Sequence, residues 1–198
     1  SCSWSASGDH TGIHTAIQNA VNNNIPVFFA AGNENTDPIG YPARYVETIA
    51  IGAMAPCENL RKSRTTCDGE TLWGSNYGAD LDISAPGVNI YTTDIQGTAG
   101  YNPAFRPDDL GDQSYTAYFG GTSSACPQVA ATAALMLAIN PHLTVPQIRS
   151  IIQSTADKVG GYNYNWNGGM PGHSIELGYG RLNALAAIAT AFTSDHPE

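Results

Sequence analysis

"GGTSSACPQVAATAALML", residues 120–137, decides the fold of this chain. Its long apolar run predicts a buried helix, and Ser123 stands at the start of that helix behind two glycines. A helix start carries unpaired backbone N–H groups and the positive end of the helix dipole, so it stabilises negative charge. Ser123 is therefore either a nucleophile that the buried helix holds in a fixed position or an ordinary helix cap, a role in which serine is common. This stretch alone leaves both interpretations open.

The composition indicates one globular domain spanning residues 1–198, since the length fits a single core. Eight Lys and Arg against 17 Asp and Glu give a formal net charge of −9. This charge repels nucleic acid and anionic membrane surfaces, so we expect neither as a partner. No apolar run approaches the roughly 20 residues that a bilayer span needs.

Apolar spacing along the chain predicts an α/β fold. Residues 11–23 have the helical spacing of apolar positions, and the run "IPVFFAAGN" that follows is typical of a buried strand. Further strands are expected at 48–54 and 81–86, a capped helix beginning at Thr144, and a last helix over 183–192. Alternating strands and helices with short links favour a largely parallel sheet.

Asn33 lies in "AAGNEN", at the carboxyl end of the first predicted strand. Active sites of α/β folds gather at such strand ends, and an asparagine amide can stabilise a developing oxyanion. By itself the residue is equally typical of a turn.

Taken together, these motifs resemble the subtilisin-like serine proteases, the subtilases. "GTSSACPQVAATAALML" is similar to the nucleophile motif of that family, "AAGN" to its oxyanion motif, and the segments 40–53, 75–87 and 178–188 follow in the family's order. The resemblance implies a subtilisin-like three-layer α/β fold. It also implies a serine endopeptidase that forms an acyl-enzyme on Ser123, with Asn33 in the oxyanion hole.

The resemblance further implies a peptide or protein substrate bound by strand pairing. The expected substrate-binding residues are Ser3, Trp4, Ser5, Ala30, Ala31, Gly32, Gly121 and, as the floor of the pocket, Gly40. A calcium site made by the carbonyls of Ala43 and Tyr45 with the Asp82 carboxylate is also implied, because oxygen ligands suit this ion. No organic cofactor is expected. The acids Asp108, Asp109 and Asp112 are interpreted as a solvated surface rather than a second calcium site.

One departure from the family concerns the catalytic base. The aspartate and histidine motifs of subtilases do not occur in these residues, so the chain is interpreted as the carboxyl-terminal part of a catalytic domain. We expect the amino-terminal half, as a separate chain, to supply both groups, and the isolated chain to be nearly inactive. We also expect an open sheet edge where that half would pair. The alternative is a degenerate subtilase that serves as a binding or structural module.

Two other sites were weighed on the residues present. The pair His10 and His14 in "HTGIHTA" has the spacing of a helical zinc pair, but its place in the chain favours an ordinary surface helix. Ser123, Asp157 and His173 run in the order of an α/β-hydrolase triad, although Ala125 stands where that fold requires glycine.

The cysteines bear on the cellular compartment. Cys57 and Cys67 bracket a polar loop that a disulfide would staple, which favours an oxidising, extracellular setting; two free thiols in the cytosol are the alternative. Cys126 lies on the apolar helix, where a buried inert thiol is expected.

Overall fold

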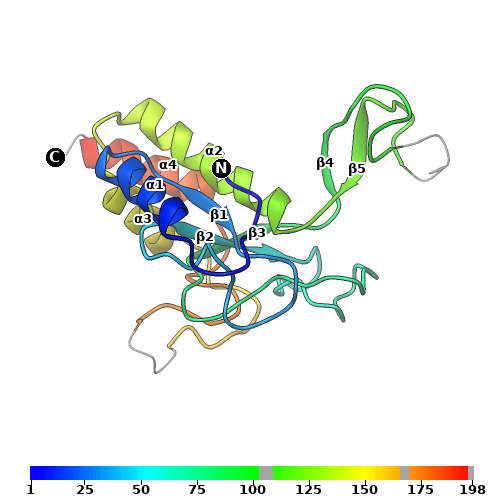
Figure 1. Ribbon diagram of the computed structural model, residues 1–198, viewed down its shortest axis with the longest axis horizontal. Helices are drawn as coiled ribbons and strands as arrows, with labels where there is room; N and C mark the ends of the chain where they lie inside the picture. The colour runs from blue at the N-terminus through cyan, green and yellow to red at the C-terminus, as the bar shows by residue number, and fades with distance from the viewer. Residues whose placement is uncertain (103–108, 166–169, 196–198) are drawn as a thin grey trace.

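The computed structural model describes residues 1–102, 109–165 and 170–195. Helices and strands follow in the order α1 (Thr11–Asn22), β1 (Phe28–Ala30), β2 (Ile49–Met54), β3 (Ile83–Pro86), β4 (Ile90–Thr93), β5 (Tyr115–Phe119), α2 (Thr122–Ile139), α3 (Val145–Ser154) and α4 (Ala184–Asp195). Figure 1 shows α1 on one side of β1–β3 and the other helices on the opposite side.

The sheet is parallel, with strand order β1-β2-β3. Phe28 pairs with Ile49 and Ile51 with Ile83, so the three strands point the same way and their carboxyl ends meet at one edge. This confirms the predicted parallel α/β arrangement. The outer edge of β1 is paired by the segment at Cys2, whose N–H donates to the Phe28 carbonyl at 2.8 Å. That segment, rather than β1, therefore forms the margin of the sheet.

The strands are buried on both faces, and alternate residues enter different cores. Phe28 and Ala30 pack with residues of α2, α3 and α4, whereas Phe29 and Ala31 pack with Ile17 of α1. A strand that is covered on both sides reads as a continuous apolar run, and "VFFAA" is such a run. The predicted three-layer arrangement is confirmed.

Helix α2 is the centre of the larger core. Ala125, Val129 and Met136 are fully buried, and the helix contacts all three strands and α4. By length and composition α2 is the one helix among the described residues that could cross a membrane. Its contacts with the sheet account for its apolar character, because a helix hydrophobic all round is typical of a protein core.

Helix α3 begins as predicted. The N–H of Thr144 donates to the side-chain oxygen of Gln147 at 2.8 Å, so the capping box is formed. Its inner face, which includes Ile148 and Ile152, is buried against the core. Cys126 of α2 is also fully buried, and burial raises the pKa of its thiol, as expected for an inert cysteine.

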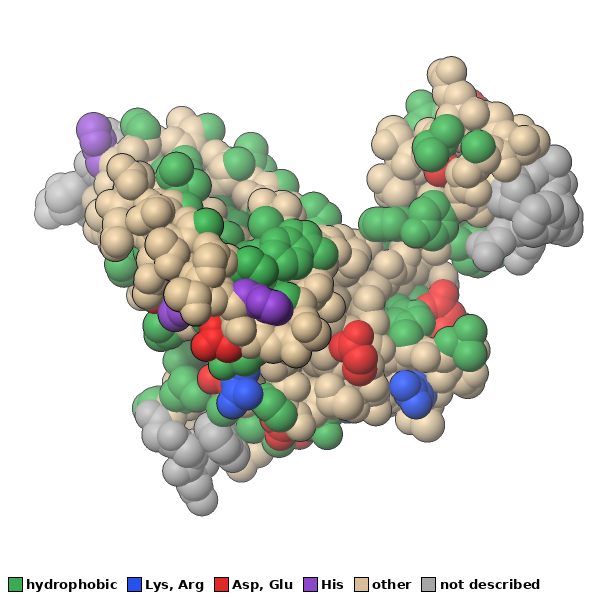
Figure 2. All heavy atoms as spheres, in the orientation of Figure 1, with side chains coloured by type: hydrophobic (Ala, Val, Ile, Leu, Met, Phe, Trp, Pro, Cys, Tyr) green, Lys and Arg blue, Asp and Glu red, His purple; other side chains and the backbone are tan. Residues whose placement is uncertain are grey.

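An antiparallel ribbon, β4–β5, protrudes from the body of the molecule (Figures 1 and 2). Neither β4 nor β5 was among the strands predicted from the sequence. Asp109 accepts from the Ala117 N–H at 2.8 Å and Asp112 from the Ser114 N–H at 2.8 Å, so these two carboxylates organise their own loop. Asp108 lies outside the described residues.

A disulfide joins Cys57 and Cys67, as the sequence predicts. We call residues 57–72, between β2 and the segment that returns to the sheet, the disulfide loop. Its Lys62 is fully buried, although the surrounding sequence is polar and was expected to be exposed.

Candidate active site

Ser123 lies in the first turn of α2, next to the carboxyl end of β1. Gly121 precedes the helix with a φ of 106°, a conformation that L side chains rarely adopt. Ser123 is half-buried, while its neighbour Ser124 is buried and donates its hydroxyl to the Gly121 carbonyl at 2.8 Å. Of the two adjacent serines, Ser123 is therefore the accessible one.

Pro127 leaves a backbone carbonyl at the start of α2 available to the first segment of the chain. Proline has no N–H, so it cannot bond the carbonyl four residues earlier, which is that of Ser123. The Ser3 hydroxyl donates to this carbonyl instead, at 3.2 Å. The sequence distance between the two residues is 120, and the contact places Ser3 beside the nucleophile candidate.

Thr122 fixes the orientation of the Asn33 amide. The Thr122 N–H donates to Asn33 Oδ1 at 2.9 Å, and the Thr122 hydroxyl donates to the same oxygen at 3.0 Å. Because a backbone N–H can only donate, the amide atom facing it is the oxygen. The NH₂ group then points the other way, and a Cβ added to Gly121 would lie only 3.3 Å from Asn33 Nδ2. Glycine at 121 keeps the space beside the amide open.

Ser123 and Asn33 line one hollow of 80 Å³. Its other lining residues are Ser3, Trp4, Ser5, Ala30, Gly32, Glu34 and Thr122. Two larger hollows, one beside Asp82 and one beside the disulfide, contain neither Ser123 nor Asn33, so size does not identify this site. The Ser123 hydroxyl, the Asn33 amide NH₂ and the Ser123 N–H converge here at the start of α2, which is an arrangement suited to attack on a carbonyl and stabilisation of the resulting oxyanion.

Five of the expected substrate-binding residues line this hollow directly, and Gly121 lies at its edge. Trp4 is 49% exposed and packs edge-on against Phe29, with ring centroids 5.2 Å apart. Ala31 and Gly40 do not line the hollow. Ala31 is buried in the smaller core, and Gly40 donates its N–H to the Ala31 carbonyl at 3.5 Å. Ala31 and Gly40 therefore lie outside the hollow, next to the segment that contributes Ala30 and Gly32 to its lining.

Glu34 and Thr122 also line the hollow and were not predicted from the sequence. Glu34 lines the hollow, and its Oε2 accepts from the Asn76 amide at 2.6 Å. The Thr122 hydroxyl accepts from the Gly32 N–H at 3.2 Å as well as bonding Asn33. Both residues are sequence neighbours of the predicted pair Asn33 and Ser123, which is the signal that could have found them.

No histidine is among the described residues that line the hollow, and its one carboxylate, Glu34, is engaged with Asn76. The described part of the chain therefore places no imidazole base beside Ser123. A serine hydroxyl without a base is a weak nucleophile at neutral pH.

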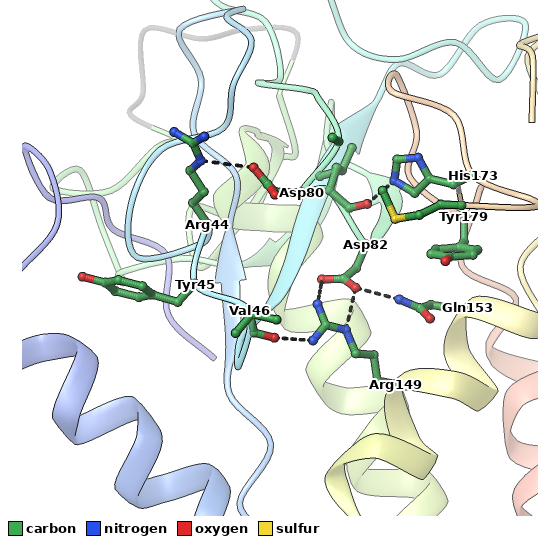
Figure 3. Close-up of a pocket in the computed structure, with 12 residues that line it drawn as sticks. Arg44, Tyr45, Val46, Asp80, Asp82, Arg149, Gln153, His173 and Tyr179 are labelled. Atoms are coloured by element: carbon green, nitrogen blue, oxygen red, sulfur yellow. Dashed lines mark hydrogen bonds and ion pairs between the residues drawn. The ribbon is translucent and has the colours of Figure 1, made fainter. Parts of the chain in front are cut away.

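The expected calcium ligands are engaged by protein groups (Figure 3). Asp82 Oδ1 accepts from Arg149 Nε and from Gln153, both at 2.7 Å, and Oδ2 accepts from Arg149 at 2.9 Å and from the Ala50 N–H at 2.8 Å. The carbonyls of Ala43 and Tyr45 both accept from the Thr48 hydroxyl at 2.8 Å.

A calcium ion needs six to eight oxygen ligands with free lone pairs. Here the Arg149 guanidinium already neutralises the Asp82 carboxylate. The four hydrogen bonds that this carboxylate accepts use lone pairs of both of its oxygens. As arranged, the Asp82 carboxylate of the expected set Ala43, Tyr45 and Asp82 is occupied by protein donors, so a calcium ion there would have to displace some of them.

The structure contradicts the zinc pair. His14 Nε2 lies 3.0 Å from Glu47 Oε2 and its ring stacks on Tyr45 with centroids 4.0 Å apart. His10 precedes α1 at the surface. Among the described residues, no group of three His, Cys, Asp or Glu side chains could hold a metal ion.

The hydrolase-type triad is also contradicted. Asp157 bonds Arg181 at 2.8 Å, and the hydrogen bonds from Arg181 and Asn183 lower the pKa of its carboxyl. His173 is fully buried with Nε2 2.7 Å from the Leu81 carbonyl, and burial lowers the pKa of its ring. Neither residue lines the hollow at Ser123.

Comparison with known proteins adds sequence relatives. The model of the subtilase family matches residues 1–180. A calcium-dependent protease of Nostoc sp. is 41% identical over 175 residues, covering 83% of this chain and 24% of the relative. Subtilisin NAT of Bacillus subtilis subsp. natto is 37% identical over 167 residues, covering 82% of this chain and 33% of the relative. The chain thus spans a third or less of the length of these two relatives.

Solved structures are similar as well. A protease of Pseudoalteromonas arctica matches with a TM-score of 0.69 and 26% identity, covering 95% of this chain and 49% of the other. Fervidolysin of Fervidobacterium pennivorans, described as a keratinolytic enzyme related to subtilisin, matches with a TM-score of 0.69 and 23% identity, covering 94% and 26%. These likenesses agree with the three-layer fold described above.

Proposed function

This chain belongs to the subtilase family, and on that premise we propose that it carries the nucleophile and oxyanion hole of a secreted serine endopeptidase. The observation that carries the proposal is the meeting of Ser123 and Asn33, from α2 and from the end of β1, in one hollow. Two segments 90 residues apart supply complementary groups for attack on one carbonyl.

In the proposed reaction, an extended peptide lies along Ser3–Ser5 and Ala30–Gly32, with a side chain in the hollow. Ser123 Oγ attacks the carbonyl carbon of the scissile bond. The C–N bond of the resulting tetrahedral intermediate then breaks, the amine leaves with the proton that the base took from Ser123, and water later hydrolyses the acyl-enzyme. Asn33 Nδ2–H and the Ser123 N–H donate to the oxyanion, which is held where the dipole of α2 favours negative charge. Gly121 leaves the approach to these donors open.

The base is proposed to come from a preceding part of the same catalytic domain. That part carries the histidine that takes the proton of Ser123 and the aspartate that orients the histidine. The lack of an imidazole among the described residues at the hollow supports this division. Secretion is supported by the Cys57–Cys67 disulfide, since disulfides persist in oxidising compartments.

A fluorophosphonate reagent tests the proposal. In the complete protein we expect covalent labelling at Ser123, located by peptide mass spectrometry, because the reagent needs a nucleophile beside an oxyanion hole. The isolated chain should react far more slowly. Ser124 is the internal control, since its buried hydroxyl is bonded to carbonyls and should stay unmodified. Labelling of neither preparation would refute the protease and favour a binding module.

The name of the Nostoc relative makes calcium a candidate cofactor of the complete protein. We expect a chelator such as EGTA to lower the melting temperature, because an ion that binds only the folded state stabilises it.

The contacts of Asp82 argue against its being a ligand, so Asp82→Asn should lower the melting temperature with and without chelator by similar amounts. Differential scanning calorimetry with and without EGTA measures both effects. If the variant no longer responds to EGTA, then Asp82 binds the ion and the geometric argument fails.

A further inference from the structure

The disulfide loop carries a carboxylate to the neighbourhood of Ser123. A Cβ added to Gly120, three residues before Ser123, would lie 3.7 Å from Trp73 Cζ2 and 3.9 Å from Glu70 Oε2. Glu70 Oε2 accepts a hydrogen bond from the Trp73 indole N–H. The tryptophan in turn precedes Gly74, whose N–H donates to the Asn33 carbonyl at 3.2 Å. Glu70 is thus positioned against the catalytic segments rather than on a distant surface.

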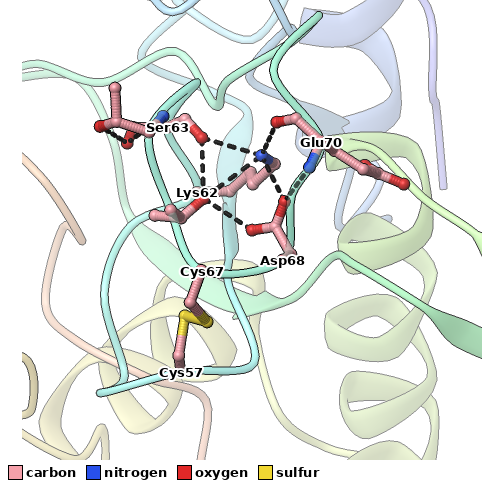
Figure 4. The surroundings of a disulfide bond; sticks show 8 residues. Cys57, Lys62, Ser63, Cys67, Asp68 and Glu70 are labelled. Atoms are coloured by element: carbon pink, nitrogen blue, oxygen red, sulfur yellow. Dashed lines mark hydrogen bonds and ion pairs between the residues drawn. A yellow bond between two sulfur atoms is a disulfide. The ribbon is translucent and has the colours of Figure 1, made fainter.

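A buried lysine holds this part of the loop in place (Figure 4). Lys62 Nζ lies 2.8 Å from Asp68 Oδ1 and donates to the Glu70 carbonyl at 2.6 Å, while the Glu70 N–H donates to Asp68 at 2.9 Å. Only the backbone of Glu70 takes part in these bonds. Its side chain extends away from the cluster in Figure 4, so the carboxylate can act without being part of the scaffold.

The charge of Glu70 is not neutralised by a neighbour. Among the described residues, no ion pair engages it. The cations of the disulfide loop bond other groups: Lys62 pairs with Asp68, Arg61 donates to Asn35 and the Ser75 carbonyl, and Arg64 donates to the Glu34 carbonyl. An uncompensated carboxylate at a binding surface favours a cationic partner.

Glu70 lies near Gly120, outside the hollow that Ser123 lines. Neither Glu70, Trp73 nor Gly120 is among the residues that line the hollow. A peptide that places the residue before its scissile bond in the hollow must lead the following residues away from it. An extended chain advances about 3.3 Å per residue, so its next one or two residues reach the neighbourhood of Trp73 and Gly120.

We propose that Glu70, held on Trp73 by the disulfide loop, selects peptides with Lys or Arg in the first two positions after the scissile bond. This inference rests on the proposed function and deepens it, because it assigns a specificity-determining residue on the leaving-group side. The side chain is half-buried, so its charge is only partly screened by water. A partly exposed ion pair of this kind corresponds to roughly a two- to fivefold preference.

Fluorogenic peptides test the inference with the complete protein. The substrates share the residues before the scissile bond and carry Arg, Gln or Glu at the first or second position after it. We expect kcat/KM to follow the order Arg, Gln, Glu, and Glu70→Gln to bring the three values together. The amide oxygen of glutamine can still accept from Trp73. The preference in the wild-type protein should also weaken with added salt.

Glu58→Gln is the matched control, since Glu58 is an exposed glutamate of the same loop. It should retain the full preference for Arg. An unchanged ratio in Glu70→Gln, or an equal loss in Glu58→Gln, would overturn the assignment while leaving the protease intact. Failure of the wild-type protein to cleave any of the peptides would instead overturn the proposed function, and this inference with it.

Discussion

Replacing Asn33 by alanine in the complete protein is expected to lower kcat about 10²–10³-fold, a magnitude taken from removal of one oxyanion donor in subtilisin. KM should change little, because the amide donates to an oxygen that becomes negative only in the transition state. Steady-state kinetics on a peptide substrate separates the two constants.

Asn33 also has a structural task, and a second variant separates the two roles. Its Oδ1 accepts from the N–H and the hydroxyl of Thr122, and alanine loses both bonds. Asn33→Asp keeps an oxygen facing Thr122 but replaces the donating NH₂ by a negative atom. It should retain the melting temperature better than Asn33→Ala and yet be at least as inactive. An aspartate variant with near-normal kcat would rule out the oxyanion role.

Replacing Lys62 by methionine is expected to lower the free energy of unfolding by about 3–5 kcal/mol, the range for breaking a buried ion pair by removing one partner. The side chains of Lys62 and Asp68 are both 0% exposed, so the orphaned carboxylate could not reach water. The carbonyls of Ser63 and Glu70 would also lose their donor. Urea denaturation of the complete protein measures the loss.

Two controls distinguish this pair from lysines in general. Lys158 donates to the carbonyls of Gly172 and Tyr179, and no ion pair within the described ranges engages it. Because it is also exposed, Lys158→Met should cost much less. The double variant Lys62→Met, Asp68→Leu should recover part of the lost stability, since it removes the unpaired charge. If the double variant were less stable than the single one, then the charge of Asp68 would not be the cause.

The effect should depend on pH. Burial alone would raise the pKa of the Asp68 carboxyl, but hydrogen bonds from Lys62, Thr66 and the Glu70 N–H hold that pKa below its ordinary value. A folded-state pKa below the unfolded one stabilises the protein above the unfolded pKa, near 4 for an aspartate. That stability is lost as pH falls through the folded pKa. The gap between wild type and Lys62→Met should therefore be largest near neutral pH and narrow in acid.

The features that were predicted from the sequence depend on patterns among residues close together in the chain. The helix starting at Thr11, the strand before Asn33 and the capping box at Thr144 each depend on neighbours within one or two turns. The meeting of Ser123 with Asn33 was anticipated through resemblance to a family, because nothing local joins residues 90 positions apart.

The features that were missed depend on partners distant in sequence. The contact of Asp82 with Arg149, 67 residues later, was not predicted because no local pattern links the two residues. Lys62 was read as part of an exposed polar loop, although its ammonium group is enclosed by carbonyls and Asp68. Strands β4 and β5 are short. Strand β4 has no buried residue and β5 has two, so neither gives a clear apolar pattern without the other.

The hydrogen bonds between Thr122 and Asn33 determine at which stage of folding the proposed oxyanion hole can form. The Asn33 amide is oriented only once the start of α2 has docked on the end of β1. Contacts between residues so far apart in the chain form late in folding. Closing a long loop costs conformational entropy before the new contacts contribute favourable energy. A nascent or unfolded molecule consequently has the serine without the oriented amide of the proposed oxyanion hole.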